Sequence, residues 1–171
     1  DVITGESRFF DKNNCSDIIS AVKASASMPV MSKMIDVEGR KYLDGGISTS
    51  IAYKRAFDVG YSKAIVVLTR EEGYRKKPVN MINESIYRRY FKPLPNLVEK
   101  LMTVPERYNK MQEEMEELAK EGKLLIIRPQ NKVTVQRLEH SSVKLEKLYN
   151  EGYEEGLKNI ENIKSFIALK F

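Results

Sequence analysis

The sequence predicts a mixed α/β fold, and three stretches of the chain carry that prediction. Residues 64–69 read Ala-Ile-Val-Val-Leu-Thr, a short continuous apolar run of the kind that forms a buried strand. Residues 51–59 before it have helical spacing, and Gly60 is a natural helix end. A second apolar run, at 124–127, follows a long helical stretch and stops before Pro129. A helix that ends on glycine and leads into a buried strand is typical of layered α/β folds.

The first fifty residues predict two short strands, a helix and a hairpin. Residues 2–10 read as two strands joined by a tight turn. The helix that follows ends before Pro29, because proline cannot continue it. Residues 34–37 and 41–43 flank a Glu-Gly pair, which indicates a hairpin.

The second half of the chain is mainly helical. Residues 80–122 are divided by prolines, and Pro105 is expected to begin a separate charged helix. In that helix, apolar residues recur at helical spacing, so their side chains are expected to face a core: Tyr108, Met111, Met115 and Leu118. Residues 141–171 predict one final helix, in which Gly152 and Gly156 indicate close packing or a bend. No segment reads as a flexible linker, so one compact unit is expected.

Composition sets limits on the kind of protein. The 29 basic and 24 acidic residues give a net charge of +5, and they are interleaved along the chain. This favours a solvated surface of mixed charge, and no nucleic-acid partner is expected. The single cysteine, Cys15, excludes an internal disulfide framework. No apolar stretch is long enough to span a membrane. The expected location is cytoplasmic, with peripheral attachment to a membrane as an alternative.

The motif with the most chemical content is Asp44-Gly45-Gly46. An aspartate at the end of a strand lies where α/β folds hold their ligands. Glycine permits a positive φ and lets another segment or a substrate approach closely. A carboxylate in such a place can accept a proton from a neighbouring hydroxyl. The same three residues are also common in simple turns.

The order of motifs around Asp44 resembles the patatin-like acyl hydrolases, in particular their bacterial branch. The resemblance rests on Ala24-Ser25-Ala26-Ser27-Met28-Pro29, Leu43-Asp44-Gly45-Gly46, the helix that ends at Gly60, and the strand that ends at Thr69. Weaker parts of the match are Thr69-Arg70, Gly73-Tyr74-Arg75-Lys76, Ile126-Ile127-Arg128-Pro129 and Leu148-Tyr149 with Gly152-Tyr153. One departure is Ile51-Ala52, where relatives usually have Ile-Pro, and it puts the local pocket shape in doubt.

The resemblance implies a three-layer α/β/α sandwich and a serine–aspartate dyad that hydrolyses lipid or phospholipid esters without a metal or organic cofactor. Asp44 would be the catalytic base, supported by Gly45 and Gly46. The nucleophile of that family lies in a G-x-S-x-G elbow, and this sequence contains none. Ser7 is not a candidate, because no second glycine follows it. The chain, 1–171, is therefore expected to be the C-terminal portion of one domain, with the nucleophile half before Asp1 and with 80–122 as a helical cap. Alone it is expected to be inactive, and to associate with its missing half or with copies of itself.

Four other residues invite a functional interpretation. His140 stands alone without a cluster of metal ligands, which favours a surface or capping role. Cys15, at a helix start, could have a lowered pKa, but a small packed side chain is favoured. Ser25 and Ser27 lie near the site in the family, and packing explains them adequately.

A rival hypothesis is a non-catalytic α/β module that binds an anionic partner, such as a lipid surface or nucleic acid. Segment 87–92 mixes aromatic and basic side chains, which suits either ligand. A cap over the active site is the favoured interpretation of that segment. The basic residues that would serve the rival hypothesis are Arg70, Arg75, Lys76, Lys77, Arg88, Arg89 and Lys92.

Overall fold

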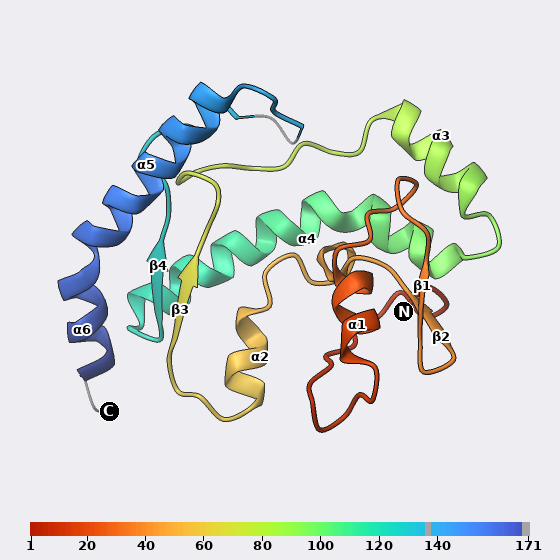
Figure 1. Cartoon of the computed structure of the whole chain (residues 1–171), viewed down its shortest axis with the longest axis horizontal. Helices are drawn as coiled ribbons and strands as arrows, with labels where there is room; N and C mark the ends of the chain where they lie inside the picture. The colour runs from red at the N-terminus through yellow and green to blue at the C-terminus, as the bar shows by residue number, and fades with distance from the viewer. Residues whose placement is uncertain (136–137, 169–171) are drawn as a thin grey trace. The chain divides into compact units, whose positions relative to one another are not determined.

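The computed structural model describes residues 1–135 and 138–168, and it has a mixed α/β architecture (Figure 1). The strands are β1 (Ile35–Val37), β2 (Arg40–Tyr42), β3 (Ala64–Val67) and β4 (Leu124–Ile127). The helices are α1 (Ile18–Ser25), α2 (Tyr53–Asp58), α3 (Met81–Tyr90), α4 (Pro95–Lys120), α5 (Ser142–Lys158) and α6 (Ile160–Ala168), with one 3₁₀ turn, η1 (Gly45–Ile47). The α/β class that the sequence predicts is confirmed.

The chain forms two compact units, each built from two separate stretches. The first unit contains Asp1–Ala52 and Arg75–Met111, and the second contains Tyr53–Tyr74 and the chain from Gln112 onward. Helix α4 therefore contributes its first turns to one unit and its last turns to the other.

In the first unit, β1 and β2 form the antiparallel hairpin that the sequence predicts. Glu38 and Gly39 both have positive φ, at 54° and 79°, as a two-residue turn between twisted strands requires. The Asp36 carboxylate accepts a hydrogen bond from the Gly39 amide at 2.9 Å, which fixes the turn. Helix α1 packs on this hairpin, where Ala24 and Val37 belong to one buried cluster.

Residues 2–10 do not form the two predicted strands. Most hydrogen bonds of their backbone are made with side chains, so no ladder of hydrogen bonds between strands forms. The Asn96 amide donates to the Ile3 carbonyl at 2.9 Å, and the Ser48 hydroxyl donates to the Gly5 carbonyl at 2.8 Å. Gly5 has φ +71°, and a Cβ atom there would lie 3.0 Å from the Asn96 carbonyl oxygen. Glycine thus lets this segment run directly against α4.

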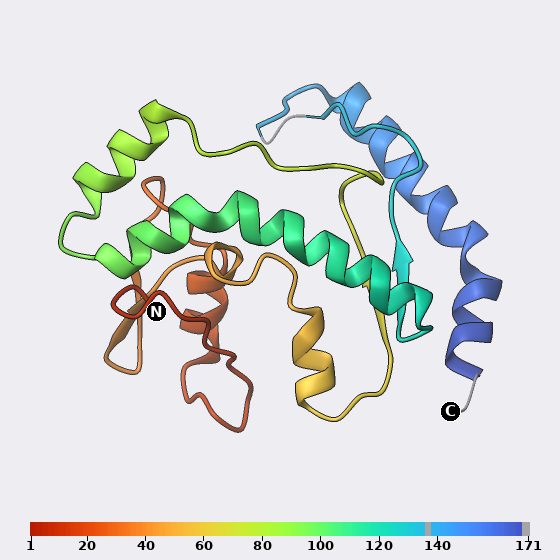
Figure 2. The ribbon, with the colours of Figure 1, turned by 180° about the vertical axis from the view of Figure 1, so that it is seen from behind.

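The predicted break at Pro105 is also wrong, because α4 continues through it from Pro95 to Lys120 (Figure 2). Proline lacks the amide that bonds the carbonyl four residues earlier. The carbonyl affected here is that of Leu101. Next to it, Thr103 Oγ1 donates to the Glu99 carbonyl and the Arg107 guanidinium donates to the Lys100 carbonyl, which adds bonds to the turn before the proline. Within this helix, Tyr108 and Met115 are buried as predicted.

In the second unit, β3 and β4 pair in parallel, with Ala64 opposite Leu124 and Val67 opposite Ile127. Both strands form where the sequence predicts them. Strand β3 is apolar on both faces, but only one of them is covered in this structure. Val66 is 8% exposed, but Val67 on the opposite face is 72% exposed. Alternate residues of a strand point to opposite faces, so one face of β3 is open.

The final helix predicted at 141–171 is divided at Asn159 into α5 and α6, and its last three residues lie outside the described ranges. The Asn159 side-chain amide donates to the Glu155 carbonyl at 2.9 Å, which ends α5. Gly152 and Gly156 do not mark close packing, since a Cβ atom at either would meet nothing within 4 Å.

Candidate functional site

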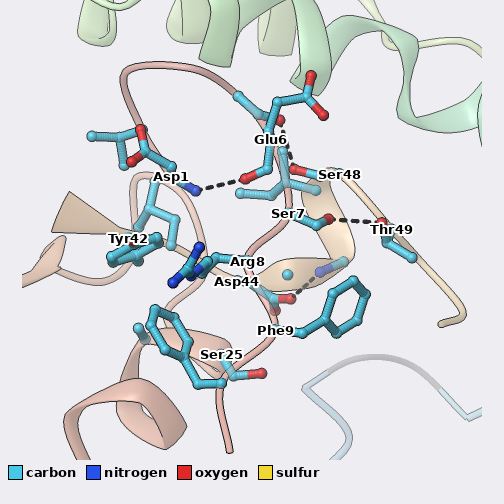
Figure 3. Close-up of a pocket in the computed structure, with 18 of the residues that line it drawn as sticks. Asp1, Glu6, Ser7, Arg8, Phe9, Ser25, Tyr42, Asp44, Ser48 and Thr49 are labelled. Carbon is cyan, nitrogen blue, oxygen red and sulfur yellow. Dashed lines mark hydrogen bonds between the residues drawn. The ribbon is translucent and has the colours of Figure 1, made fainter. Parts of the chain in front are cut away.

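A cavity of about 260 Å³ in the first unit contains Asp44 in its wall (Figure 3). Segment 5–10, the end of α1 and residues 42–50 supply most of the lining, and Leu97 of α4 completes it. Charged side chains in the wall are Asp1, Glu6, Arg8 and Asp44. The cavity is thus polar where Asp44 lies and apolar where Phe9, Phe10 and Leu97 lie.

Asp44 is half-buried and follows β2 after Leu43, at the end of a strand as the sequence predicts. That strand belongs to the antiparallel hairpin β1–β2 and not to the parallel pair β3–β4. Its amide donates to the Ser27 carbonyl at 2.9 Å. Its Oδ1 accepts the Gly46 amide at 2.7 Å, so the carboxylate caps η1. In the part of the chain that the structure describes, no hydrogen bond ends on Oδ2. This oxygen remains available as a proton acceptor.

Gly45 and Gly46 do not adopt the positive φ that the sequence suggests, but Gly46 does allow a close approach. Neither has a positive φ, because both belong to η1. A Cβ atom on Gly46 would lie 3.0 Å from Asp44 Oδ1, tighter than ordinary contact. The glycine at position 46 therefore allows the carboxylate to bond the backbone closely.

Arg107 on α4 fixes the turn that follows Asp44, and sequence reasoning did not identify it. Its guanidinium donates to the carbonyl oxygens of Ile47 at 2.7 Å and Ser48 at 2.5 Å. A further bond reaches the Lys100 carbonyl at 2.6 Å. Burial lowers the pKa of this guanidinium, while Glu6 and Glu99 oppose that effect. The Asp44 turn is thus tied to a long helix by one cation.

Hydroxyl groups crowd the same wall. Ser7 Oγ lies 2.7 Å from Thr49 Oγ1, and Figure 3 shows these two side chains pointing toward each other. Ser50 Oγ donates to the Gly46 carbonyl at 3.1 Å. The run Ser48-Thr49-Ser50, directly after the motif, is the sequence signal that could have indicated this cluster. Ser7 therefore shares its hydroxyl hydrogen bond with Thr49, and within the described residues no hydrogen bond joins it to Asp44.

Arg8, Phe9 and Ser25 also line the cavity, and Figure 3 draws them around Asp44. The Arg8 guanidinium lies 5.9 Å from the centre of the Phe10 ring, which in turn meets Tyr42 edge-on at 5.2 Å. The segment that holds Arg8 comes to this wall through long-range bonds, so sequence reasoning missed it.

The remaining candidates from the sequence lie elsewhere. His140 is exposed just before α5. Cys15 is buried in the cluster with Ala24 and Val37, as a packed side chain. Ser27 is buried and donates to the Lys23 carbonyl at 2.8 Å. Within residues 1–135 and 138–168, no group of three or more His, Cys, Asp or Glu side chains could hold a metal ion. No helix in these ranges is long and apolar enough to cross a bilayer.

The basic residues of the rival hypothesis differ in their surroundings. Lys76 Nζ lies 4.2 Å from the centre of the Tyr108 ring, and Arg70 lies 5.1 Å from that of Tyr74. Arg88 pairs with Glu84 at 2.8 Å. Arg75, Lys77, Arg89 and Lys92 lie at exposed positions, and so does Arg88.

Comparison with known proteins gives one finding. A family model described as a domain of unknown function (DUF6363) matches residues 94–168, which is less than half of the chain. The match begins one residue before α4 and contains Arg107 but not Asp44. No curated protein and no solved structure shows a significant match to this chain.

Proposed function

We propose that this chain is the C-terminal part of a patatin-like serine acyl hydrolase in which Asp44 is the catalytic base. The observation that carries the proposal is the Asp44 carboxylate in the wall of the cavity, with Oδ1 held by Gly46 and Oδ2 available. The motif order around it, from Ala24 to Thr69, supports the same proposal. Arg107 keeps the turn in place by bonding its carbonyl oxygens.

The reaction has two steps in this proposal. Asp44 takes the proton of a serine hydroxyl as that oxygen attacks the ester carbonyl. The carbon–oxygen bond of the ester then breaks, and the departing alcohol receives the proton. Asp44 next removes a proton from water as the water oxygen attacks the acyl carbon. The bond from that carbon to the serine oxygen breaks, the acid leaves, and Asp44 returns the proton to the serine oxygen. The serine and the oxyanion hole belong to the segment proposed before Asp1.

The wider assignments follow from the same family. The substrates are lipid or phospholipid esters, and no cofactor is needed. The parallel pair β3–β4 supplies later strands of a three-layer sandwich, and the open face of β3 at Val67 suits a missing layer. Residues 80–122 form a cap over the site. The protein works in the cytoplasm, where it can attach to the membrane surface.

The test is hydrolysis of p-nitrophenyl butyrate by the full-length protein that the gene encodes and by residues 1–171 alone. The full-length protein is expected to turn over, and Asp44→Asn to lower kcat by about 100- to 10,000-fold. Asp58→Asn is the matched control, since Asp58 is an exposed aspartate of the second unit. Residues 1–171 are expected to be inactive. Turnover by residues 1–171 that disappears on Ser7→Ala, or full activity in Asp44→Asn, contradicts the proposal.

A further inference from the structure

Helix α3 exposes its apolar side chains to solvent. Met81 is 81% exposed and Ile82 is 72% exposed, while Ile86 and Tyr90 are 41% and 60% exposed. No residue of α3 is buried. Large apolar side chains that gather on one short helix at this exposure indicate a surface that meets a partner.

The helix is nevertheless anchored in the first unit from its other side. Tyr87 packs against the main apolar cluster, and Phe91, which ends the helix, is 2% exposed within it. Phe91 also meets Tyr90 edge-on at 4.9 Å. Asn80 caps the start of the helix by accepting the Asn83 amide at 2.8 Å. The exposed face is therefore presented by a fixed helix.

The net positive charge of the chain is concentrated on this helix and its flanks. Residues 75–92 contain six basic and one acidic side chain, a net charge of +5, which equals the net charge of all 171 residues. The rest of the chain, with 23 basic and 23 acidic residues, is neutral. Acidic and basic residues are therefore not interleaved in this segment as they are expected to be along the whole sequence. This favours an anionic partner.

Basic and apolar groups share one face of α3. Ile82, Ile86 and Arg89 follow each other at steps of four and three residues, which places them on the same side of a helix. Arg89 is exposed at the end of this face, and Lys92 is exposed just beyond the helix. A helix that combines aliphatic side chains with basic ones can lie in the plane of a lipid interface, with its apolar side chains among the acyl chains.

We propose that residues 75–92 dock the protein on an anionic lipid membrane, with α3 lying in the interface. Lipid suits the face better than nucleic acid does. Single-stranded nucleic acid is held by stacking on aromatic rings, whereas three of the four exposed apolar side chains of α3, Met81, Ile82 and Ile86, are not aromatic, and Tyr90 is the fourth. The basic side chains bind the lipid headgroups, and the aliphatic ones enter the layer beneath. This docking does not depend on the hydrolase activity proposed above.

The test is co-sedimentation of residues 1–171 with phosphatidylcholine vesicles that contain or lack phosphatidylglycerol. Binding is expected only with the anionic lipid, and it should weaken as salt is added. Arg89→Gln with Lys92→Gln is expected to weaken binding roughly 30-fold, from two charges near the surface. Ile82→Asn is expected to weaken it roughly tenfold through lost apolar burial.

Matched controls separate the surface from general effects. Ile19→Asn changes the second residue of α1, which is 63% exposed, just as Ile82 is the second residue of α3. Lys12→Gln with Lys110→Gln removes two exposed charges outside the segment. Both controls are expected to bind like the unaltered protein. If Ile82→Asn fails to fold, Met81→Gln replaces it. The proposal is overturned if the protein binds neutral vesicles equally well, or if the controls lose as much binding as the test variants. It is also overturned if the protein binds single-stranded DNA but not the vesicles, and Ile82→Asn leaves that DNA binding intact.

Discussion

Arg107 shows how one side chain can organise the candidate site. It reaches three carbonyl oxygens, two of which belong to the turn after Asp44. Without this cation, the oxygens of Ile47 and Ser48 lose charge-assisted bonds at the edge of a buried cluster that includes Ile47. A sequence motif around position 44 cannot reveal such a partner, because Asp44 and Arg107 are 63 positions apart.

Replacement of this guanidinium should be costly. Arg107→Met is expected to lower the free energy of unfolding by about 2–4 kcal/mol, because half-buried carbonyls are left without donors. Urea denaturation measures the change. Arg89→Met, at an exposed position on α3, is the matched control, and it should change stability by less than about 0.5 kcal/mol. Equal effects of the two variants would show that the bonds of Arg107 add nothing to stability.

At the scale of single elements, the sequence predicts structure that depends on neighbouring residues. It does not predict structure that depends on contacts between residues far apart in the chain. The hairpin at Glu38 was predictable because its turn residues determine its geometry. The continuation of α4 through Pro105 was not, since it depends on tertiary packing of residues on both sides of the proline, such as Leu101 and Tyr108, which are buried. Residues 2–10 were assigned to strands wrongly, because donors such as Asn96 lie far away in the sequence.

The hairpin turn also carries a pH-sensitive contact. The Glu38 carboxylate accepts the amide and the hydroxyl of Ser16, at 2.8 and 2.9 Å, and the amide bond above all lowers the pKa of Glu38. A carboxyl whose pKa is lower in the folded state stabilises the fold above its unfolded pKa, and the contribution is lost as pH falls through the folded value. Stability should therefore fall between about pH 5 and about pH 3. Glu38→Gln, measured by thermal unfolding across that range, should show a smaller fall, and an equal fall would exclude this contact as a cause.

At the scale of the whole molecule, the second unit leaves apolar surface open. Val67 of β3 is 72% exposed, and Tyr149 and Tyr153 of α5, which stack at 6.4 Å, are 70% and 60% exposed. Such surfaces favour association with a further segment or another copy. The sequence predicted both strands but not which face would be open, because that depends on what packs against them.

Residues 1–171 alone are therefore expected to self-associate at micromolar concentration. Sedimentation velocity should show a sedimentation coefficient that rises with protein concentration. Tyr149→Glu should shift the protein toward the monomer, because it places a charge in the open apolar surface. Tyr61→Glu, a tyrosine 67% exposed outside α5, is the control and should leave the distribution unchanged. A monomer with a cooperative melt at every concentration would mean that these surfaces need no partner.

The role of Asp44 as a base is tested most directly by the rate of reaction with a fluorophosphonate. This reagent reports on the base because it reacts only with an activated serine. Intact-mass measurement of the full-length protein should show one adduct, and peptide mapping should place it on a serine that precedes Asp1. Asp44→Asn should slow its formation by about 100-fold or more, and Asp58→Asn should not change it. An adduct on Ser7, or an unchanged rate in Asp44→Asn, would contradict the assignment of Asp44 as the base.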